Sequence, residues 1–402
     1  MKRSTDRILT THVGSLVRPV DVLEDILKKV AGKPVDDAAF QKKVKVGVTD
    51  VVRKQSEIGI DIPSDGEFSK PTFSSYIAER LDGLGPTPPN TKPYTYAKLQ
   101  EEFPGFMKEY NAMYTKLWMP KSIPEQVVAD AMAAPPDVHS VIAPIAYKGE
   151  TLLQRDIDNF KSALDGLPFI EAFMPSATPS RSDVDTDQIY PTETAYLYAL
   201  ADAMHEEYKA IVDAGLVVQL DLGLPARNQV LPDNPNPSVA ELRRASEMQI
   251  EAYNHALRGI PEDRVRYHLC WGSMNTPHTT DVPLRDIVDL ILKINAQAYS
   301  IEAANPRHEH EWQVWKDVKL PDGKILIPGV VSHSTNVVEH PELIALRIKN
   351  FASVVGRENV IASTDCGFAQ GWSMIRVHPE VQWAKLASLV EGAAIASRDL
   401  WR

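Results

Sequence analysis

The 402-residue sequence has very little cysteine: Cys270 and Cys366 are the only two. Two cysteines cannot build the disulfide framework of a small secreted protein. The chain opens on Met-Lys-Arg-Ser-Thr-Asp and shows no apolar secretory segment there. We therefore expect a reducing, cytoplasmic location, in which each cysteine serves metal binding, catalysis or packing.

Long hydrophobic runs and an excess of positive charge are also missing. No run of about 18 uncharged apolar residues occurs, so we expect no membrane span. The formal net charge is −11, which argues against nucleic acid as a partner, because phosphate binding needs a basic face. Small-molecule substrates remain as the expected partners, and a homo-oligomer stays open.

Short β-like runs rich in Val and Ile alternate with segments of helical periodicity. Alternation of this kind over one chain of this length predicts an α/β fold, a (β/α)8 TIM barrel that spans residues 1–402 as a single domain. The predicted strands are 8–14, 58–67, 168–175, 215–223, 264–270, 298–304, 324–331 and 359–367, and the clearest predicted helices are 197–215, 238–260, 283–297 and 340–356.

One long segment, residues 84–150, does not fit a minimal barrel. It is rich in proline and aromatic residues up to about residue 136, and residues 137–150 look like an extra hairpin. We interpret it as an insertion between the second and third strands. Because such an insertion follows a barrel strand, it lies on the catalytic face, where we expect a lid or a substrate wall. A peripheral dimer arm is the alternative.

Polar residues able to bind a metal stand at the ends of three predicted strands. His268 and Cys270 are two positions apart on an extended segment, so their side chains point to the same side. Glu302 and Cys366 end two other strands on the same rim. Thiolate, imidazole and carboxylate are the ligands that zinc accepts in a tetrahedral site. Ordinary packing of buried cysteines is the alternative.

Six short motifs follow one another along nearly the whole chain: HVGSLVRP near the start, DGE at 65–67, HLC at 268–270, IEAAN at 301–305, SHS at 332–334 and DCG at 365–367. In these motifs and their order the sequence resembles the catalytic domain of cobalamin-independent methionine synthase and its shorter relatives. The resemblance implies zinc held by His268, Cys270, Glu302 and Cys366. It also implies that zinc binds a thiol substrate and lowers its pKa, so that the thiol attacks as a zinc-bound thiolate.

The resemblance also implies substrate-binding residues. Val13-Gly14-Ser15 matches a segment that holds the thiol substrate through its backbone. Glu67 and Asp221 match two acids that meet the substrate's amine, which is sensible because a buried cation must be paired. His333 matches a histidine suited to proton transfer near the methyl donor. The alternatives are a structural carboxylate for Glu67 and a core histidine for His333.

These features predict a zinc-dependent methyltransferase, similar to 5-methyltetrahydropteroyltriglutamate–homocysteine methyltransferase. Asp221 is followed by Leu222-Gly223, where the family has an acid and proline. That change favours a second hypothesis, in which a thiol such as coenzyme M opens an epoxide. A third is a metal-free relative of uroporphyrinogen decarboxylase, and a fourth is a non-catalytic module with structural zinc.

Overall fold

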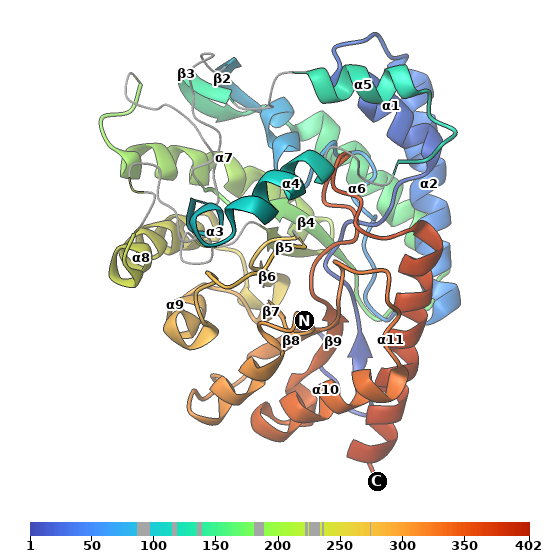
Figure 1. Ribbon diagram of the computed structural model, residues 1–402, viewed down its shortest axis with the longest axis vertical. Coiled ribbons are helices and arrows are strands. Elements are labelled where there is room, and N and C mark those ends of the chain that lie inside the picture. The colour runs from blue at the N-terminus through green and yellow to red at the C-terminus, as the bar shows by residue number, and fades with distance from the viewer. Residues whose placement is uncertain are drawn as a thin grey trace.

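A curled parallel β-sheet of seven strands forms the centre of the protein in the computed structural model (Figure 1). The structure describes residues 1–86, 97–114, 119–134, 139–180, 189–221, 224, 234, 237–273 and 275–402. In the sheet the strands follow the order β1-β9-β8-β7-β6-β5-β4. Their bounds are β1 Leu9–Thr10, β4 Phe173–Ala177, β5 Val217–Asp221, β6 Val265–Leu269, β7 Ala298–Glu302, β8 Ile325–Val331 and β9 Ile361–Thr364.

The segment around Ile62 joins the two edge strands of this sheet. Ile62 forms an isolated parallel bridge with Thr11, beside β1. On the other side, Phe173 of β4 donates its backbone N–H to the carbonyl of Pro63 (3.1 Å). This linkage is consistent with a TIM-barrel-like fold.

The predicted strand 58–67 is therefore wrong in extent. Helix α2 (Asp37–Ile58) runs into its start and ends at Gly59, which has a left-handed φ of 87°. Pro63 lacks the N–H that a longer ladder would need. Gly66 and Glu67 then turn the chain with positive φ. In place of the predicted strand 58–67, the structure has a single bridge at Ile62.

The inside of the curled sheet holds an apolar layer of its own. The side chains come from six strands and from the Ile62 bridge, and all of them are buried. Alternate residues of a strand point to opposite faces, so each of these six strands sends one or two such residues inward and others toward the helices. The layer consists of Leu9, Ile62, Phe173, Val217, Ala298, Ile325, Ile327 and Ile361.

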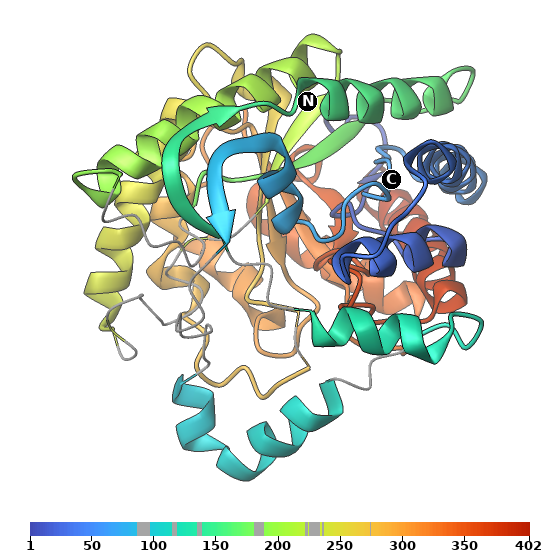
Figure 2. The same cartoon turned by 90° about the horizontal axis from the view of Figure 1, so that it is seen from above.

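Helices surround the sheet when it is viewed from above (Figure 2). The predicted helices 197–215, 238–260 and 340–356 are confirmed as α7, α8 and α10. A capping box of Ser238 and Glu241 starts α8. The helices around the sheet are α1 Val20–Val30, α2, α6 Glu150–Leu164, α7 Glu193–Asp213, α8 Val239–Ala256, α9 Val288–Ile291, α10 Pro341–Val355 and α11 Pro379–Leu400; short 3₁₀ helices are η1 Ser75–Arg80, η3 Glu262–Arg264, η4 Leu284–Asp286, η5 Glu309–Lys316 and η6 Arg357–Asn359.

The predicted helix 283–297 is wrong as a single element. The structure has the 3₁₀ turn η4 followed by the four-residue helix α9. Several backbone bonds here close after three residues, such as Lys293 N–H to the Leu290 carbonyl (3.0 Å). Ile287, Leu290 and Ile291 are all buried. Packing of these apolar residues stabilises the segment without a continuous helix. Their helix-like spacing therefore predicted a longer helix than the structure has.

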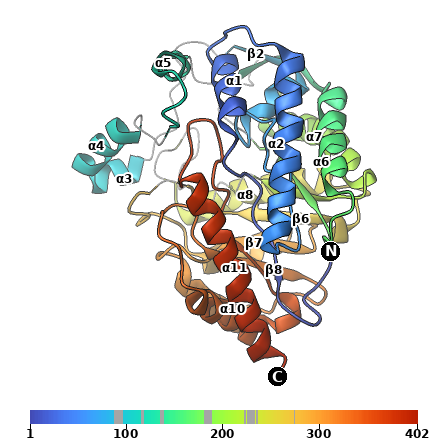
Figure 3. The same ribbon diagram turned by 90° about the vertical axis from the view of Figure 1, so that its right-hand side faces the viewer.

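The segment between residues 81 and 147 is partly separate from the sheet. Strand β2 (Leu81–Pro86) pairs antiparallel with β3 (His139–Tyr147). Residues 137–150 thus contribute one strand to a distant partner, and the hairpin predicted within them is wrong. Its partner lies about fifty residues upstream, where no local pattern reveals it. Helix α5 (Glu125–Ala133) lies near α1, while α3 (Ala97–Glu102) and α4 (Pro104–Tyr114) project from the ring of helices (Figures 2 and 3).

No helix in the described part of the chain is both long enough and apolar enough to cross a membrane.

A buried ionic network ties η1 to two of the outer helices. Arg80 donates to Asp156 of α6 (2.6 Å) and to Glu207 of α7 (3.0 Å). Tyr76 also donates to Glu207 (2.7 Å). Burial opposes ionisation of Glu207, but Arg80 and Tyr76 hold its pKa below its usual range. The network therefore depends on its one guanidinium.

A second buried network holds the segment after β6 against η5. His308 contacts Asp281 through Nε2 (2.9 Å) and Glu311 through Nδ1 (2.8 Å). Its ring stacks on Trp271, with the centroids 3.9 Å apart. Although burial opposes the charge, the two carboxylates raise the pKa of His308 to about 10. These contacts account for the burial of His308.

Replacing Arg80 by methionine should destabilise the protein by about 3–5 kcal/mol, because two buried carboxylates lose their cation. Urea unfolding followed by circular dichroism measures the change. Lys209→Met is the matched control, since Lys209 pairs with Asp213 on the surface and should cost less than about 1 kcal/mol. Equal effects of the two substitutions would contradict the account.

His308→Gln should destabilise the protein most below pH 7 and less as the pH rises toward 10. The folded pKa of His308 is raised to about 10, above roughly 6.5 for an unfolded histidine. Its contribution is therefore fully present below the unfolded value and is lost as pH rises through the folded one. Unfolding of wild type and variant at several pH values measures this. His310→Gln, on the exposed side of η5, should show no such trend.

Candidate metal and thiol site

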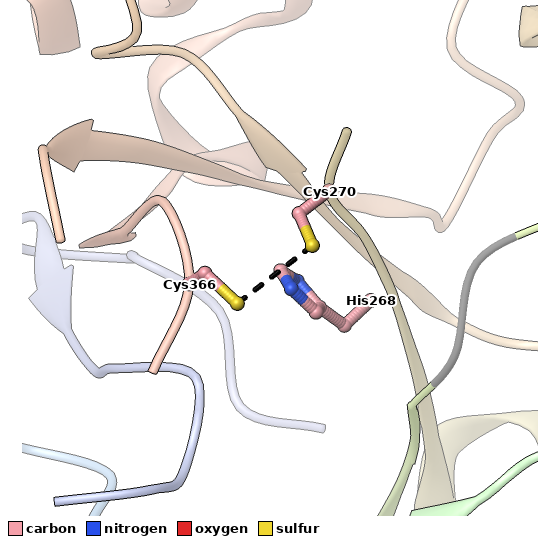
Figure 4. Close-up of side chains that lie close together, drawn as sticks. All are labelled: His268, Cys270 and Cys366. Atoms are coloured by element: carbon pink, nitrogen blue, oxygen red, sulfur yellow. Dashed lines mark hydrogen bonds between the residues drawn. The ribbon is translucent and has the colours of Figure 1, made fainter. Parts of the chain in front are cut away.

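His268, Cys270 and Cys366 converge at the carboxyl end of the sheet (Figure 4). His268 belongs to β6, Cys270 follows that strand directly, and Cys366 follows β9. One ligand atom from each lies within 4.8 Å of the others, and all three side chains are buried. The two sulfur atoms are 3.7 Å apart. The convergence of these three predicted ligands is thus observed.

A close approach of two backbones brings Cys366 to this position. β8 pairs with β9 through a register shift between Gly329 and Val331. A side chain on Gly329 would overlap the backbone of Asp365, so only glycine lets the two strands approach. Asp365 in turn accepts the N–H groups of Ala303 (2.7 Å) and Ala304 (2.8 Å), which ties the end of β7 to the turn that carries Cys366.

The three side chains fit a zinc ion in both chemistry and spacing. Two sulfurs bound at ~2.3 Å in a tetrahedral site lie about 3.8 Å apart, close to the 3.7 Å between Cys270 and Cys366. The Nδ1 of His268 contacts Ser300 Oγ at 3.1 Å. Its Nε2 is buried and has no hydrogen-bond partner among the described residues. Metal-binding histidines are commonly oriented in this way, with one ring nitrogen in a hydrogen bond and the other available to the metal.

Glu302, the fourth predicted ligand, lies in a neighbouring group. Its ligand atom clusters with those of His333 and Asp365. Its two oxygens accept the N–H of Trp271 (2.9 Å) and the amide of Asn305 (3.0 Å). Burial, and then the nearby Cys270, raise its pKa. Glu302 is therefore beside the three converging ligands and held by other partners.

His333 is enclosed by this second group. It is 1% exposed, and neither ring nitrogen has a hydrogen-bond partner in the described structure. Burial lowers its pKa to about 3, so the imidazole is neutral. Asp365 has one buried oxygen, Oδ2, in the same condition, and burial followed by the charge of Glu302 raises its pKa far above the usual range.

The predicted substrate-binding segment Val13–Ser15 lies close to Glu67 and to the turn after β9. Gly14 has φ of +135°, and a side chain there would come within 2.8 Å of Glu67 Oε1. Ser15 accepts the N–H of Phe368 through its carbonyl (2.9 Å), and a side chain on Gly367 would overlap Ser15 Oγ. The segment after β1 therefore touches both Glu67 and the turn that carries Cys366.

Gln219 connects Asp221 to Val13 by hydrogen bonds. The Gln219 amide donates to both oxygens of Asp221 (2.9 and 3.1 Å) and to the carbonyl of Val13. Burial raises the pKa of Asp221 to about 7, with His268 opposing the rise and Glu67 adding to it. Glu67 itself lies 3.4 Å from Lys70 Nζ. The segment Val13–Ser15 is therefore near both acids: Gly14 lies close to Glu67, and Gln219 links Val13 to Asp221.

Sequence reasoning missed several residues that hold these groups. Gln219 and Ser300 stand on strands, and Asp365 directly follows β9. Each is within two residues of a predicted site residue, and that proximity was the only signal. Ser273 donates to Cys366 Sγ (3.6 Å), but it lies on an irregular segment after β6. Nothing in the local pattern predicts that contact.

A family model matches the part of the chain that carries most of these residues. The family model described as the cobalamin-independent synthase, catalytic domain, matches residues 176–386, more than half of the chain. That range contains His268, Cys270, Glu302, His333 and Cys366. It begins after Val13–Ser15 and Glu67.

Individual relatives are distant but cover the chain well. A methionine synthase of Sulfolobus acidocaldarius is 23% identical, over 97% of this chain and 93% of that protein. A 5-methyltetrahydropteroyltriglutamate–homocysteine methyltransferase of Xylella fastidiosa is 25% identical over 91% of this chain, which spans 41% of that longer protein.

A solved structure has the same fold. The B12-independent methionine synthase of Shewanella sp. W3-18-1, in complex with selenomethionine, superposes with a TM-score of 0.71 at 18% identity. The match covers 98% of this chain and 99% of that one. From the family model, with the motifs and the site geometry, the chain belongs to the family of the cobalamin-independent synthase catalytic domain.

Proposed function

We propose that this protein transfers a methyl group to the thiol of homocysteine, with zinc held by His268, Cys270, Cys366 and Glu302. The observation that carries the proposal is the convergence of two thiols and one unpartnered imidazole nitrogen on one buried point. Relatives of this family named for methionine synthesis support the reaction, and the Xylella name supports a methyltetrahydropteroyl donor.

Zinc bound at this point would lower the pKa of an incoming thiol and make it a nucleophile at neutral pH. His268 would contribute Nε2, since Ser300 occupies its Nδ1. Glu302 lies beside this position and is held by Trp271 and Asn305. We propose that it completes the ligand set and is the ligand that gives way to the acceptor.

The acceptor would lie along Val13-Gly14-Ser15, with its ammonium group between Glu67 and Asp221. With a pKa raised to about 7 by burial, Asp221 is partly protonated at neutral pH. A cation arriving beside it would favour the ionised form, so binding and charge reinforce each other. Gln219 holds this carboxylate and the Val13 carbonyl in one arrangement.

His333 is proposed to move the proton that the methyl donor needs. It is neutral and enclosed, and its two nitrogens have no partner among the described residues. It can therefore accept or donate a hydrogen bond on either side without breaking an existing one. Its neighbours Glu302 and Asp365 are the groups with which it would exchange a proton.

The fold supports a matching architecture for the whole chain. We propose that residues 1–402 form one (β/α)8 barrel closed at the Ile62 bridge, and that residues 84–150 are an insertion that acts as a lid on the substrate site. Helices α3 and α4 of this segment lie close to the loop after β6, through Tyr110 and Asn275 (3.1 Å). A cytoplasmic location is part of the same proposal.

A second candidate reaction keeps the metal and changes the substrates. The residues after Asp221, Leu222 and Gly223, differ from the acid and proline of the family, and they lie outside the described residues. An acceptor without an α-amino group, such as coenzyme M adding to an epoxide, would not need that acid.

The purified protein should contain about one zinc per chain, and Cys270→Ser and Cys366→Ser should each lose it, because each removes one of few ligands. Methyl transfer from a methyltetrahydropteroyl donor to homocysteine should fall by at least about 100-fold in both variants. Elemental analysis and product formation measure the two effects. Ser353→Ala, on the exposed side of α10, is the control and should keep both.

Zinc retained in both cysteine variants would overturn the metal assignment. Zinc lost as expected, with no product from homocysteine but a thioether from coenzyme M and an epoxide, would favour the second candidate.

A further inference from the structure

A zinc site with two cysteine ligands raises a question of selectivity for a methyltransferase. If zinc held the acceptor thiol beside Cys270 and Cys366, three sulfurs would compete for one methyl group. Each is anionic in character and therefore nucleophilic. The enzyme would inactivate itself if a ligand sulfur took the methyl group, so the ligands must react more slowly than the acceptor.

One ligand sulfur has a hydroxyl donor aimed at it. Ser273 Oγ donates a hydrogen bond to Cys366 Sγ at 3.6 Å, a normal distance for sulfur as acceptor. Donation into a sulfur lone pair withdraws the electron density that would attack carbon.

The loop after β6 holds the Ser273 hydroxyl in place. Just before Ser273, Trp271 is anchored by its backbone N–H to Glu302 (2.9 Å), by its indole N–H to the Val282 carbonyl (2.8 Å), and by stacking on His308. A donor on a segment fixed in this way is pre-organised and needs little ordering when the metal binds.

The projecting helices hold the far side of the same segment. The hydroxyl of Tyr110 in α4 accepts the N–H of Asn275 (3.1 Å), and Thr279 donates to Glu102 of α3 (2.6 Å). The helices α3 and α4 therefore contact a loop that reaches a metal ligand.

We infer that Ser273 is a positioning residue that lowers the nucleophilicity of Cys366, so that the methyl group goes to the acceptor thiol and not to the metal ligand. The inference rests on the proposed function, because it presumes that Cys366 is a zinc ligand. It adds to that function the feature that protects the site from its own reaction.

The test uses the zinc-loaded full chain and iodomethane as a probe. In this reaction the sulfur of Cys366 forms a bond to the methyl carbon, the carbon–iodine bond breaks, and iodide leaves with the electron pair. Peptide mapping by mass spectrometry measures the rate at which Cys366 is methylated. Ser273→Ala should raise that rate about threefold to tenfold, as expected for loss of one hydrogen bond to a charged sulfur.

Ser273→Thr keeps the hydroxyl and should restore the wild-type rate, and Ser353→Ala on the surface of α10 should leave it unchanged. Equal methylation of Cys366 in wild type and Ser273→Ala, or faster methylation in the alanine and threonine variants alike, would overturn the inference. Metal content, measured on the same samples, distinguishes failure of the proposed function from failure of the Ser273 inference. Wild type that binds no zinc would refute the proposed function, whatever the methylation rates.

Discussion

The site depends on one constraint, the register of the parallel strands β6 to β9. Leu269 lies opposite Ile301, Glu302 opposite Gly329, and Val331 opposite Thr364. This register brings the ends of four strands to one level and places His268, Cys270, Glu302, His333 and Cys366 on one rim. A slip of one residue in any pair would turn a ligand to the opposite face. The apolar layer inside the sheet and the Gly329 contact with Asp365 keep the register where it is.

Buried polar groups around these side chains fix their orientation. Ser300 holds His268, Trp271 and Asn305 hold Glu302, and two backbone N–H groups hold Asp365. Gln219 likewise holds Val13 and Asp221 by hydrogen bonds. Ser273 is different in kind, because its partner is a sulfur whose reactivity matters. Positioning and reactivity are therefore controlled by neighbouring segments, and the loop after β6 takes part in both.

Much of this arrangement could be predicted from sequence, for physical reasons. His268 and Cys270 share a side of a strand because side chains alternate, and strand ends in an α/β barrel meet at one rim. Val-rich runs bounded by Gly, Pro or Asp identified seven of the eight strands. The strand at 58–67 failed because Pro63 and the turn at Gly66 interrupt its ladder. The partner of β3 and the contact of Ser273 with Cys366 depend on residues far apart in the chain, and local patterns carry no information about them.

The central claim is that a thiol substrate joins Cys270 and Cys366 on one zinc ion. X-ray absorption at the zinc edge tests it most directly, with the zinc-loaded protein measured before and after addition of homocysteine. The account predicts two sulfur neighbours before addition, from Cys270 and Cys366, and a third sulfur afterwards, with one nitrogen from His268 present in both. A sulfur shell that stays the same when homocysteine is added would contradict it.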